Sequence, residues 1–439
     1  ERIEARIPFT LTESQQQVIE EIAGDITTTT PMNRLLQGDV GSGKTVVALH
    51  AMLMAVTCNA QAAMMAPTEL LAEQHFKTIT TLLANSNVTI ALLTSSLPTK
   101  DRKELIHRIS DGTIDIVVGT HALLTDDVVF LNIALTITDE QHRFGVHQRA
   151  LLRNKSDDAH AIPHTLVMTA TPIPRTLSLT IFGDLDVSTI KGMPPGRTPI
   201  TTRLVQPEQS KKVYQYMLDL INKGQQGYVV VPLVEETESG LKSVIAHAET
   251  LQDGYLKGKT IGVVHGRMKS DAREETMSAF RDGKIDVLVA TTVIEVGVDI
   301  ANATMMVIEH ADRFGLAQLH QLRGRVRRGT LPGVCALIAS PTTDDALSRL
   351  QAIVDTTDGF IIAERDLEIR GPGELFGAKQ SGIAPFKVAR LPRDFELLRL
   401  ARRTAANWIE QDPTLRDAPL LKSRLMHLHG EALGLGDVA

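Results

Sequence analysis

The sequence predicts an α/β protein with two tandem domains, each built on a parallel sheet, followed by a mainly helical region. Short apolar segments alternate with helical segments over roughly the first three quarters of the chain, a rhythm typical of parallel sheets wrapped by helices. The Pro- and Gly-rich stretch 191–200 interrupts this rhythm, which then restarts. Beyond about residue 346 the strand-like segments stop. The predicted domains are therefore 1–192, 193–345 and 346–439.

Runs of aliphatic residues mark the individual strands of both predicted sheets. Such short runs, bounded by turn residues, are typical of strands buried on both faces. Strands are expected in the first domain at "RLLQ" (34–37), 62–67, 114–120, 134–140 and 164–171, and in the second at 227–234, 260–266, 285–292, 304–310 and 333–340.

Composition excludes several classes of protein. The 439 residues carry a net charge of −6, so a nucleic-acid partner would need a local basic surface such as the Arg-rich stretch 323–328. The two cysteines lack metal-ligand spacing, which argues against a disulfide scaffold or a structural zinc and favours a reducing cytosol. The apolar region 45–66 is interrupted by polar residues and is too short for a membrane span.

The stretch "GDVGSGKT" (38–45) is the strongest motif in the chain, because it matches the phosphate-loop pattern in full. Glycines at 38, 41 and 43 let backbone N–H groups curl around phosphate oxygens at a helix N-terminus. Lys44 is expected to reach the β- and γ-phosphates, and Thr45 to offer its hydroxyl to Mg²⁺. A strand-like run precedes the motif and a helical one follows it, as such a loop requires.

Two adjacent acids end the strand-like run 134–140, and they complement the phosphate loop. A phosphate loop with Mg²⁺ needs an acidic ligand from a neighbouring strand end, which Asp139 can supply. Glu140 can then orient or deprotonate the attacking water. An exposed turn would also place acids here, but the phosphate loop makes that alternative the weaker one.

The function of two further motifs remains open when each motif is considered alone. The stretch 168–176, "MTATPIPRT", follows a strand and by itself favours an ordinary turn. The stretch 321–329, "QLRGRVRRG", places four arginines close together. These arginines could stabilise charge in phosphoryl transfer, form a solvated basic face or contact a DNA backbone.

The order of these motifs resembles the superfamily-two helicases and translocases, in which two RecA-like domains sandwich ATP. Within that superfamily, "DEQHRFGV", "PPGRTPI", "VVHGRMK" and "QLHQLRGRV" resemble the RecG-type family of ATP-dependent DNA helicases. The stretch 358–382 resembles the helical-hairpin translocation motif shared with transcription–repair coupling factors. Gln141 and the 194–200 linker favour the RecG type over the coupling factors.

The resemblance implies a role for each matching residue. Phosphate, Mg²⁺ and water would be held by the loop and the two acids, and the second domain would complete the site. Nucleotide binding is assigned to Gln15, Gly38, Gly41, Ser42, Gly43, Lys44, Thr45, Gly297 and Asp299; Mg²⁺ to Thr45 and Asp139; catalysis to Lys44, Asp139, Glu140, Gln321, Arg325 and Arg328; DNA contact or coupling to Thr68, Thr120, His142, Thr171, Thr291, Thr292, Arg370 and Gln380.

The resemblance also implies partners and a task. ATP and Mg²⁺ would drive translocation on branched or forked duplex DNA, regressing stalled forks and migrating Holliday junctions in repair and recombination. A monomer in the bacterial cytoplasm, associated with the nucleoid and not with a membrane, is expected, with a single-strand-binding protein as a partner.

Two departures from the family pattern keep an alternative open. Arg327 stands where the family's last motif usually has glycine, which puts the placement of Arg328 in doubt. The family's N-terminal wedge domain is not expected within this chain, which starts at the helicase core. The alternatives are a transcription–repair coupling translocase and a protein that binds DNA and nucleotide with impaired turnover. A P-loop ATPase unrelated to nucleic acid would leave the second α/β domain unexplained.

Overall fold

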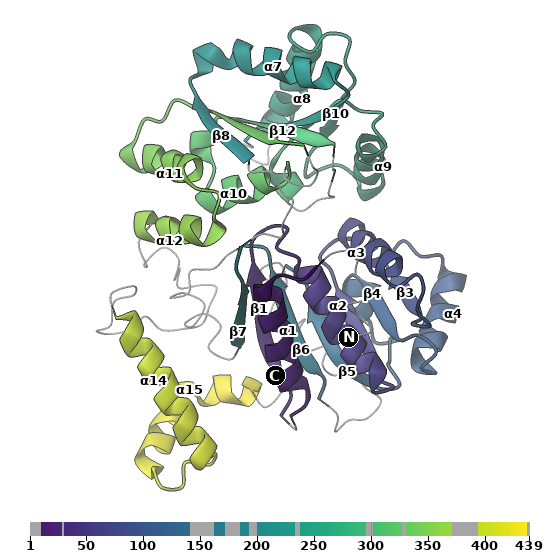
Figure 1. Ribbon diagram of the computed structural model, residues 1–439, viewed down its shortest axis with the longest axis vertical. Helices are drawn as coiled ribbons and strands as arrows, with labels where there is room; N and C mark the ends of the chain where they lie inside the picture. The colour runs from purple at the N-terminus through teal and green to yellow at the C-terminus, as the bar shows by residue number, and fades with distance from the viewer. Residues whose placement is uncertain are drawn as a thin grey trace.

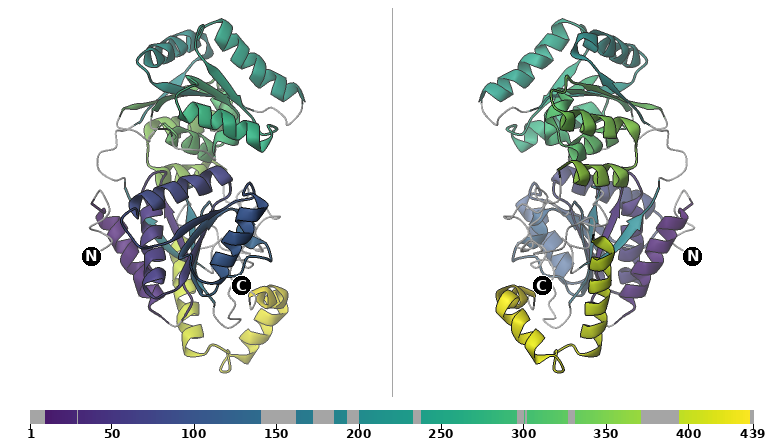
Figure 2. Two further views of the ribbon diagram at one scale, coloured as in Figure 1. Left: turned by 90° about the vertical axis from the view of Figure 1, so that its right-hand side faces the viewer. Right: turned by 90° about the vertical axis from the view of Figure 1, so that its left-hand side faces the viewer.

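The protein folds into two α/β domains and a set of C-terminal helices (Figure 1). The computed structural model describes residues 10–28, 30–140, 162–171, 185–192, 200–232, 238–295, 300, 302–326, 331–370 and 394–436. In both views of Figure 2 the two domains are stacked along the long axis, and the last helices lie beside the first domain.

The first domain is a seven-stranded, fully parallel sheet in the order β3-β4-β2-β5-β6-β1-β7. Its strands are nearly continuous apolar runs because helices cover both faces. The core includes Leu36, Met52 and Ile137, all buried. The elements are α1 (Glu13–Ile26), β1 (Asn33–Gly38), α2 (Lys44–Thr57), β2 (Gln61–Met65), α3 (Glu69–Leu82), β3 (Ile90–Leu93), α4 (Thr99–Ser110), β4 (Ile116–Gly119), β5 (Ile133–Thr138), β6 (His164–Thr169) and β7 (Asp186–Ile190).

The second domain is a six-stranded parallel sheet in the order β10-β11-β9-β12-β13-β8. Two buried clusters, one on each face, fill its core around residues such as Met306 and Val307. Its elements are β8 (Ile200–Val205), α7 (Ser210–Asn222), β9 (Gln226–Val230), α8 (Glu238–Asp253), β10 (Ile261–Val264), α9 (Ser270–Arg281), β11 (Val287–Ala290), β12 (Ala303–Glu309), α10 (Leu316–Gly324) and β13 (Gly333–Ile338).

The remaining described helices are α11 (Asp344–Asp355), α12 (Gly359–Arg370), α14 (Phe395–Gln411) and α15 (Pro419–Gly436). Helices α11 and α12 pack against α10, so they extend the second domain. Helix α14 instead returns to the first domain, where the Arg402 guanidinium donates to the Leu185 carbonyl at 2.9 Å. The C-terminal region therefore contacts both domains.

The predicted fold class, two parallel-sheet domains of the RecA type, is confirmed. Every expected strand is present, with ends shifted by a few residues. Strands β3, β7 and β8 were not expected; all three lie at sheet edges, and β7 and β8 alternate polar and apolar residues. The helical hairpin expected in 358–382 is described only up to Arg370, within α12, and its remainder, 371–382, lies outside the described residues. In the described part of the chain, none of the helices combines the length and apolar character of a membrane span.

Candidate nucleotide site

The phosphate loop joins β1 to α2, as the motif predicts. Gly41 and Gly43 have positive φ angles of 78° and 87°, which only glycine adopts without strain. A Cβ on Gly38 would lie 2.6 Å from Ser42 Oγ, so the loop also needs glycine where it packs on itself. This backbone leaves the first N–H groups of α2 facing the loop, the arrangement that binds phosphate.

Lys44 is buried inside this loop. Its Nζ donates to the carbonyls of Gly38 at 2.8 Å and Asp39 at 3.1 Å, which holds the ammonium over the loop. The Ser42 hydroxyl is buried, and among the described residues no partner for it is found. A cationic amine, glycine-shaped backbone and an unsatisfied hydroxyl in one loop fit a bound phosphate.

Gln15 packs against this loop. Its side-chain amide donates to the Ser42 carbonyl at 2.9 Å, and its Oε1 accepts from Thr12 N–H in the capping box of α1. Helix α1 thus braces the loop through Gln15. Its role in nucleotide binding stays a prediction.

Asp139 lies directly after β5, where it is almost fully buried. Its Oδ2 accepts from His75 Nε2 at 2.8 Å, and its Oδ1 accepts from Glu140 N–H at 3.0 Å. Burial would raise the pKa of Asp139, but these hydrogen bonds and the charges of His75 and Lys44 lower it below its ordinary value. The carboxylate is therefore ionised and fixed in orientation, which suits a metal ligand.

Glu140 has a positive φ of 53°, an unusual backbone angle for a residue other than glycine. Burial and the charge of Asp139 raise the pKa of Glu140, while Lys44, Arg325 and the Ala170 N–H oppose the rise. These groups come from three separate motifs, so the phosphate loop, the 168–176 segment and the Arg-rich segment all meet at Glu140. That convergence could not be derived from spacing along the chain.

The second domain contributes Arg325, which ends α10, and the half-buried Gln321 in the same helix. Thr171 has its hydroxyl 2.7 Å from that of Thr169 at the end of β6. Arg370 is the last residue of α12. The other predicted site residues His142, Gly297, Asp299, Arg328 and Gln380, and also Arg327, lie outside the described residues.

The threonines assigned to DNA contact divide into two groups. Thr68 and Thr120 cap α3 and the 3-10 turn His121–Leu124, and both line a cavity of about 570 Å³. Val264, Met277 and Val293 of the second domain line its other side, so the cavity lies between the domains. Thr291 is buried and Thr292 begins a 3-10 turn, and neither lines this cavity.

Three polar residues of the site were not singled out from the sequence. His75 orients Asp139, and His320 Nε2 donates to the Asp39 carboxylate at 2.7 Å between α10 and the phosphate loop. The "EQH" triplet at 73–75 and the Asp of "GDVG" were visible signals, but their partners are 64 and 281 residues away along the chain. In the described part of the chain no group of three acidic, His or Cys side chains suits a metal, and the assignment of Mg²⁺ to Asp139 and the Thr45 hydroxyl stays a prediction.

Three family models match the chain in order. Residues 12–180 match the DEAD/DEAH box helicase model, and residues 209–330 match the helicase conserved C-terminal domain. Residues 356–432 match the C-terminal part of domain 3 of the ATP-dependent DNA helicase RecG. The two sheets, the shared nucleotide site and these matches define the chain as the two-domain core of a helicase-class protein.

Close relatives narrow this class. The chain is 48% identical over 433 residues to the ATP-dependent DNA helicase RecG of Streptococcus pneumoniae, covering 97% of this chain and 64% of that protein. With its counterpart from Synechocystis it shares 46% over 435 residues, 99% of this chain and 52% of the relative. The chain is therefore homologous to RecG-type ATP-dependent DNA helicases over nearly its whole length. It spans about half to two thirds of the length of these relatives.

Solved structures agree with this placement. A structure described as RecG bound to a three-way DNA junction superimposes with a TM-score of 0.77 at 43% identity, covering 90% of this chain and 51% of the other. The DUF1998 helicase MrfA bound to DNA matches at 17% identity with a TM-score of 0.61, which supports the fold alone.

Proposed function

We propose that this chain is the ATP-driven motor core of a RecG-type DNA helicase, which translocates on duplex DNA and remodels branched junctions in repair and recombination. The observation that carries the proposal is the meeting of Lys44, Asp139, Glu140 and Arg325 at one edge between the two domains. The names of the relatives, and the three-way junction held by the RecG structure, support the choice of DNA substrate.

The chemistry follows from the residues that meet there. Bound Mg²⁺, held by Asp139 and Thr45, would neutralise charge on the nucleotide phosphates. Lys44 adds a second positive charge, and Arg325 adds a third from the other domain. Glu140 is placed to orient the attacking water; burial and the charge of Asp139 raise its pKa, and Lys44 and Arg325 counteract part of that rise.

Because Arg325 and Glu140 belong to different domains, the site is complete only when the domains are together. Opening and closing of the cleft would then be coupled to hydrolysis, and Thr68 and Thr120 would face the DNA across the cavity. The division at 192 and 345, the remaining site residues, a monomeric state, a single-strand-binding partner and a bacterial cytoplasmic location associated with the nucleoid are parts of the same proposal.

Steady-state ATP hydrolysis tests the proposal. The rate is measured with no DNA, with linear duplex and with a three-way junction at one fixed salt concentration, since phosphate contacts are salt-sensitive. We expect stimulation by both DNAs and more by the junction. Equal stimulation would locate junction choice outside this chain. Turnover that DNA leaves unchanged would contradict the motor function itself.

A further inference from the structure

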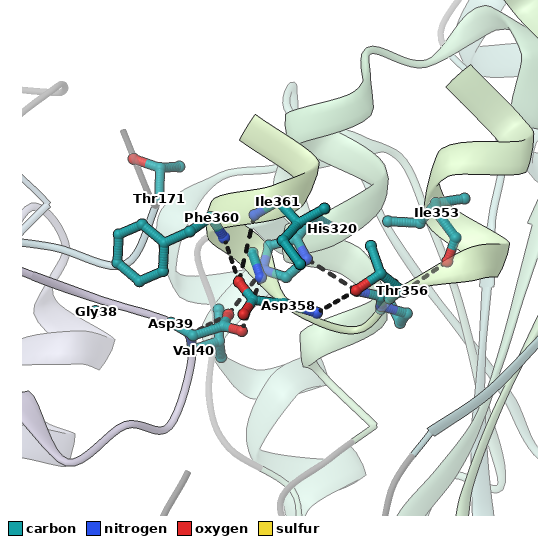
Figure 3. Close-up of polar contacts among 12 residues, drawn as sticks. Gly38, Asp39, Val40, Thr171, His320, Ile353, Thr356, Asp358, Phe360 and Ile361 are labelled. Atoms are coloured by element: carbon teal, nitrogen blue, oxygen red, sulfur yellow. Dashed lines mark hydrogen bonds and ion pairs between the residues drawn. The ribbon is translucent and has the colours of Figure 1, made fainter. Parts of the chain in front are cut away.

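A buried polar chain links the phosphate loop to the helix that leads into the C-terminal region (Figure 3). The Asp39 carboxylate accepts from His320 Nε2 at 2.7 Å through Oδ1 and from the Gly359 N–H at 3.3 Å through Oδ2. Gly359 is the first residue of α12. A side chain of the nucleotide loop therefore contacts two separate elements of the second domain and its extension.

The direction of each hydrogen bond follows from the donors. Arg323 Nη2 lies 3.0 Å from His320 Nδ1, and a guanidinium can only donate, so Nδ1 accepts. The ring proton is then on Nε2, which donates to Asp39. Arg323 is anchored in turn, because its Nη1 donates to the carbonyls of Ile353 and Thr356 at 2.7 Å each.

Asp39 also completes the cap of α12. The first N–H groups of a helix lack partners within it, and a carboxylate beside them is favourable. Asp358 Oδ1 accepts from the N–H groups of Phe360 and Ile361 at 2.8 and 3.3 Å (Figure 3). The Gly359 N–H is satisfied from the other domain, by Asp39.

The contact is closely packed on both sides. A Cβ on Gly324 of α10 would lie 3.1 Å from Val40 Cβ, so the loop and this helix touch without space between them. Asp39 is also bound to the nucleotide machinery, because its own carbonyl accepts from Lys44 Nζ. A phosphate that draws Lys44 toward it therefore changes the forces on the Asp39 backbone.

We propose that Asp39 is a positioning residue that couples the nucleotide cradle to helix α12. In this arrangement the state of the loop sets how well the start of α12 is capped, and α12 lies within residues 356–432, which match the C-terminal part of RecG domain 3. The inference rests on the proposed function only in taking ATP as the nucleotide of the loop.

Hydrogen exchange of the full chain, with and without Mg²⁺ and a non-hydrolysable ATP analogue, tests the coupling. In the unmodified chain, nucleotide should alter exchange of the amides at 359–361. In Asp39→Ala the Gly359 amide should exchange on the order of tenfold faster, since its hydrogen bond to a charged group is lost, and exchange at 359–361 should no longer respond to nucleotide. Asp358→Ala is the matched control: it removes the local cap, yet the Gly359 amide should still respond.

Binding of fluorescent ADP separates this inference from the proposed function. If the unmodified chain binds no nucleotide, the proposed function fails. If it binds nucleotide while exchange at 359–361 stays unchanged, or if Asp39→Ala binds nucleotide and still responds, the coupling is overturned. Should Asp39→Ala lose nucleotide binding, Gly359→Pro decides, because it removes the N–H from which Asp39 accepts and leaves the loop residues unchanged; a full response of the 360–361 amides in that variant also overturns the coupling.

Discussion

The two domains share an internal framework of equivalent strands and buried glutamine hydrogen bonds, but they differ in the functional residues of their loops. In the first, the Gln61 side chain donates to the carbonyls of Ile109 and Ile114 at 3.0 and 2.8 Å. At the equivalent place in the second, Gln226 donates to the carbonyls of Phe280 and Ile285 at 2.7 Å each. Both glutamines begin the strand at the third position of their sheet order, β2 and β9.

The repetition extends to the neighbouring strands. The sequences "DGTIDIVVGT" (111–120) and "DGKIDVLVAT" (282–291) occupy the same place, and Asp115 and Asp286 accept from the N–H groups of Thr89 and Thr260. Only the first domain has a glycine loop after its equivalent strand: β1 runs into the phosphate loop, whereas β8 is followed by a 3-10 turn at Pro207–Gln209. The frame makes the fold, and the chemistry lies in the loops grafted on it.

The prediction with the largest expected effect tests whether ATP hydrolysis depends on only one of the two similar domains. Lys44→Ala should lower ATP turnover on the order of 10²-fold or more, because a cation aimed at transferring charge is lost. Lys211→Ala is the counterpart, an exposed lysine in the first turn of the helix after β8. It should leave turnover within about twofold, as exposed substitutions usually do. A comparable loss in both variants would break the comparison.

The repeated frame itself is tested by Gln61→Ala and Gln226→Ala. Each removes the donor from two buried carbonyls, which should reduce the stability of its own domain by about 2–4 kcal/mol. Hydrogen exchange resolved by domain is the suitable measurement, since unfolding of a multidomain chain is not two-state. Gln17→Ala, at an exposed position of α1, serves as control. Unequal losses of stability would mean that the two glutamines do not contribute equally to their domains.

An acid ends the equivalent strands β5 and β12, but it has different partners. His75 holds Asp139, whereas Glu309 accepts from the Tyr214 hydroxyl. His75→Ala should weaken Mg²⁺-dependent binding of fluorescent ADP about tenfold, because the metal ligand loses its orientation. Tyr214→Phe should leave that binding unchanged. Rescue by His75→Asn, which keeps a donor, would separate orientation from simple misfolding.

A pair of matched glycines sharpens the comparison on a smaller scale. Gly112 and Gly283 follow equivalent helices with φ of 79° and 74°, so alanine should cost about 1 kcal/mol at either site. A Cβ on Gly112 would lie 2.7 Å from Leu131 Cδ2, whereas a Cβ on Gly283 would have no heavy atom within 4 Å in the described structure. Leu131 is exposed and can rotate, so Gly112→Ala should be worse by only a few tenths of a kcal/mol. Hydrogen exchange near each glycine measures the two losses of stability. Equal losses, or a larger loss for Gly283→Ala, would contradict the prediction.

The smallest effect concerns the surface where the domains face each other. Burial and the charge of Glu274 raise the pKa of Glu73, so this contact is most stable in acid and loses stability as pH rises through the raised pKa. Glu274→Gln should reduce that pH dependence to the part caused by burial, and strengthen duplex binding about threefold at low salt. Glu275→Gln, exposed on the same helix, is the control for net charge. Equal gains from both variants would make the effect nonspecific.

Sequence reasoning went furthest where the signal is local. The glycine pattern of 38–45 predicted the phosphate loop, and aliphatic runs predicted the central strands of both sheets. Edge strands such as β7 and β8 were not predicted, because one side of each strand is polar. The pairs His75–Asp139 and Asp39–His320 escaped for another reason: side chains distant along the chain meet only after two sheets have folded and docked.

The contact of Arg402 with Leu185 makes the second domain a segment fastened at both ends. The chain leaves the first domain after β7, builds the second, and returns through α14 to the start of β7 itself. The second domain is connected to the first at two points, so its association with the first domain is intramolecular. For short connections the effective concentration of such a process reaches the millimolar range. Even weak contacts across the cleft can then be well populated, so little binding energy is needed to hold the two domains together.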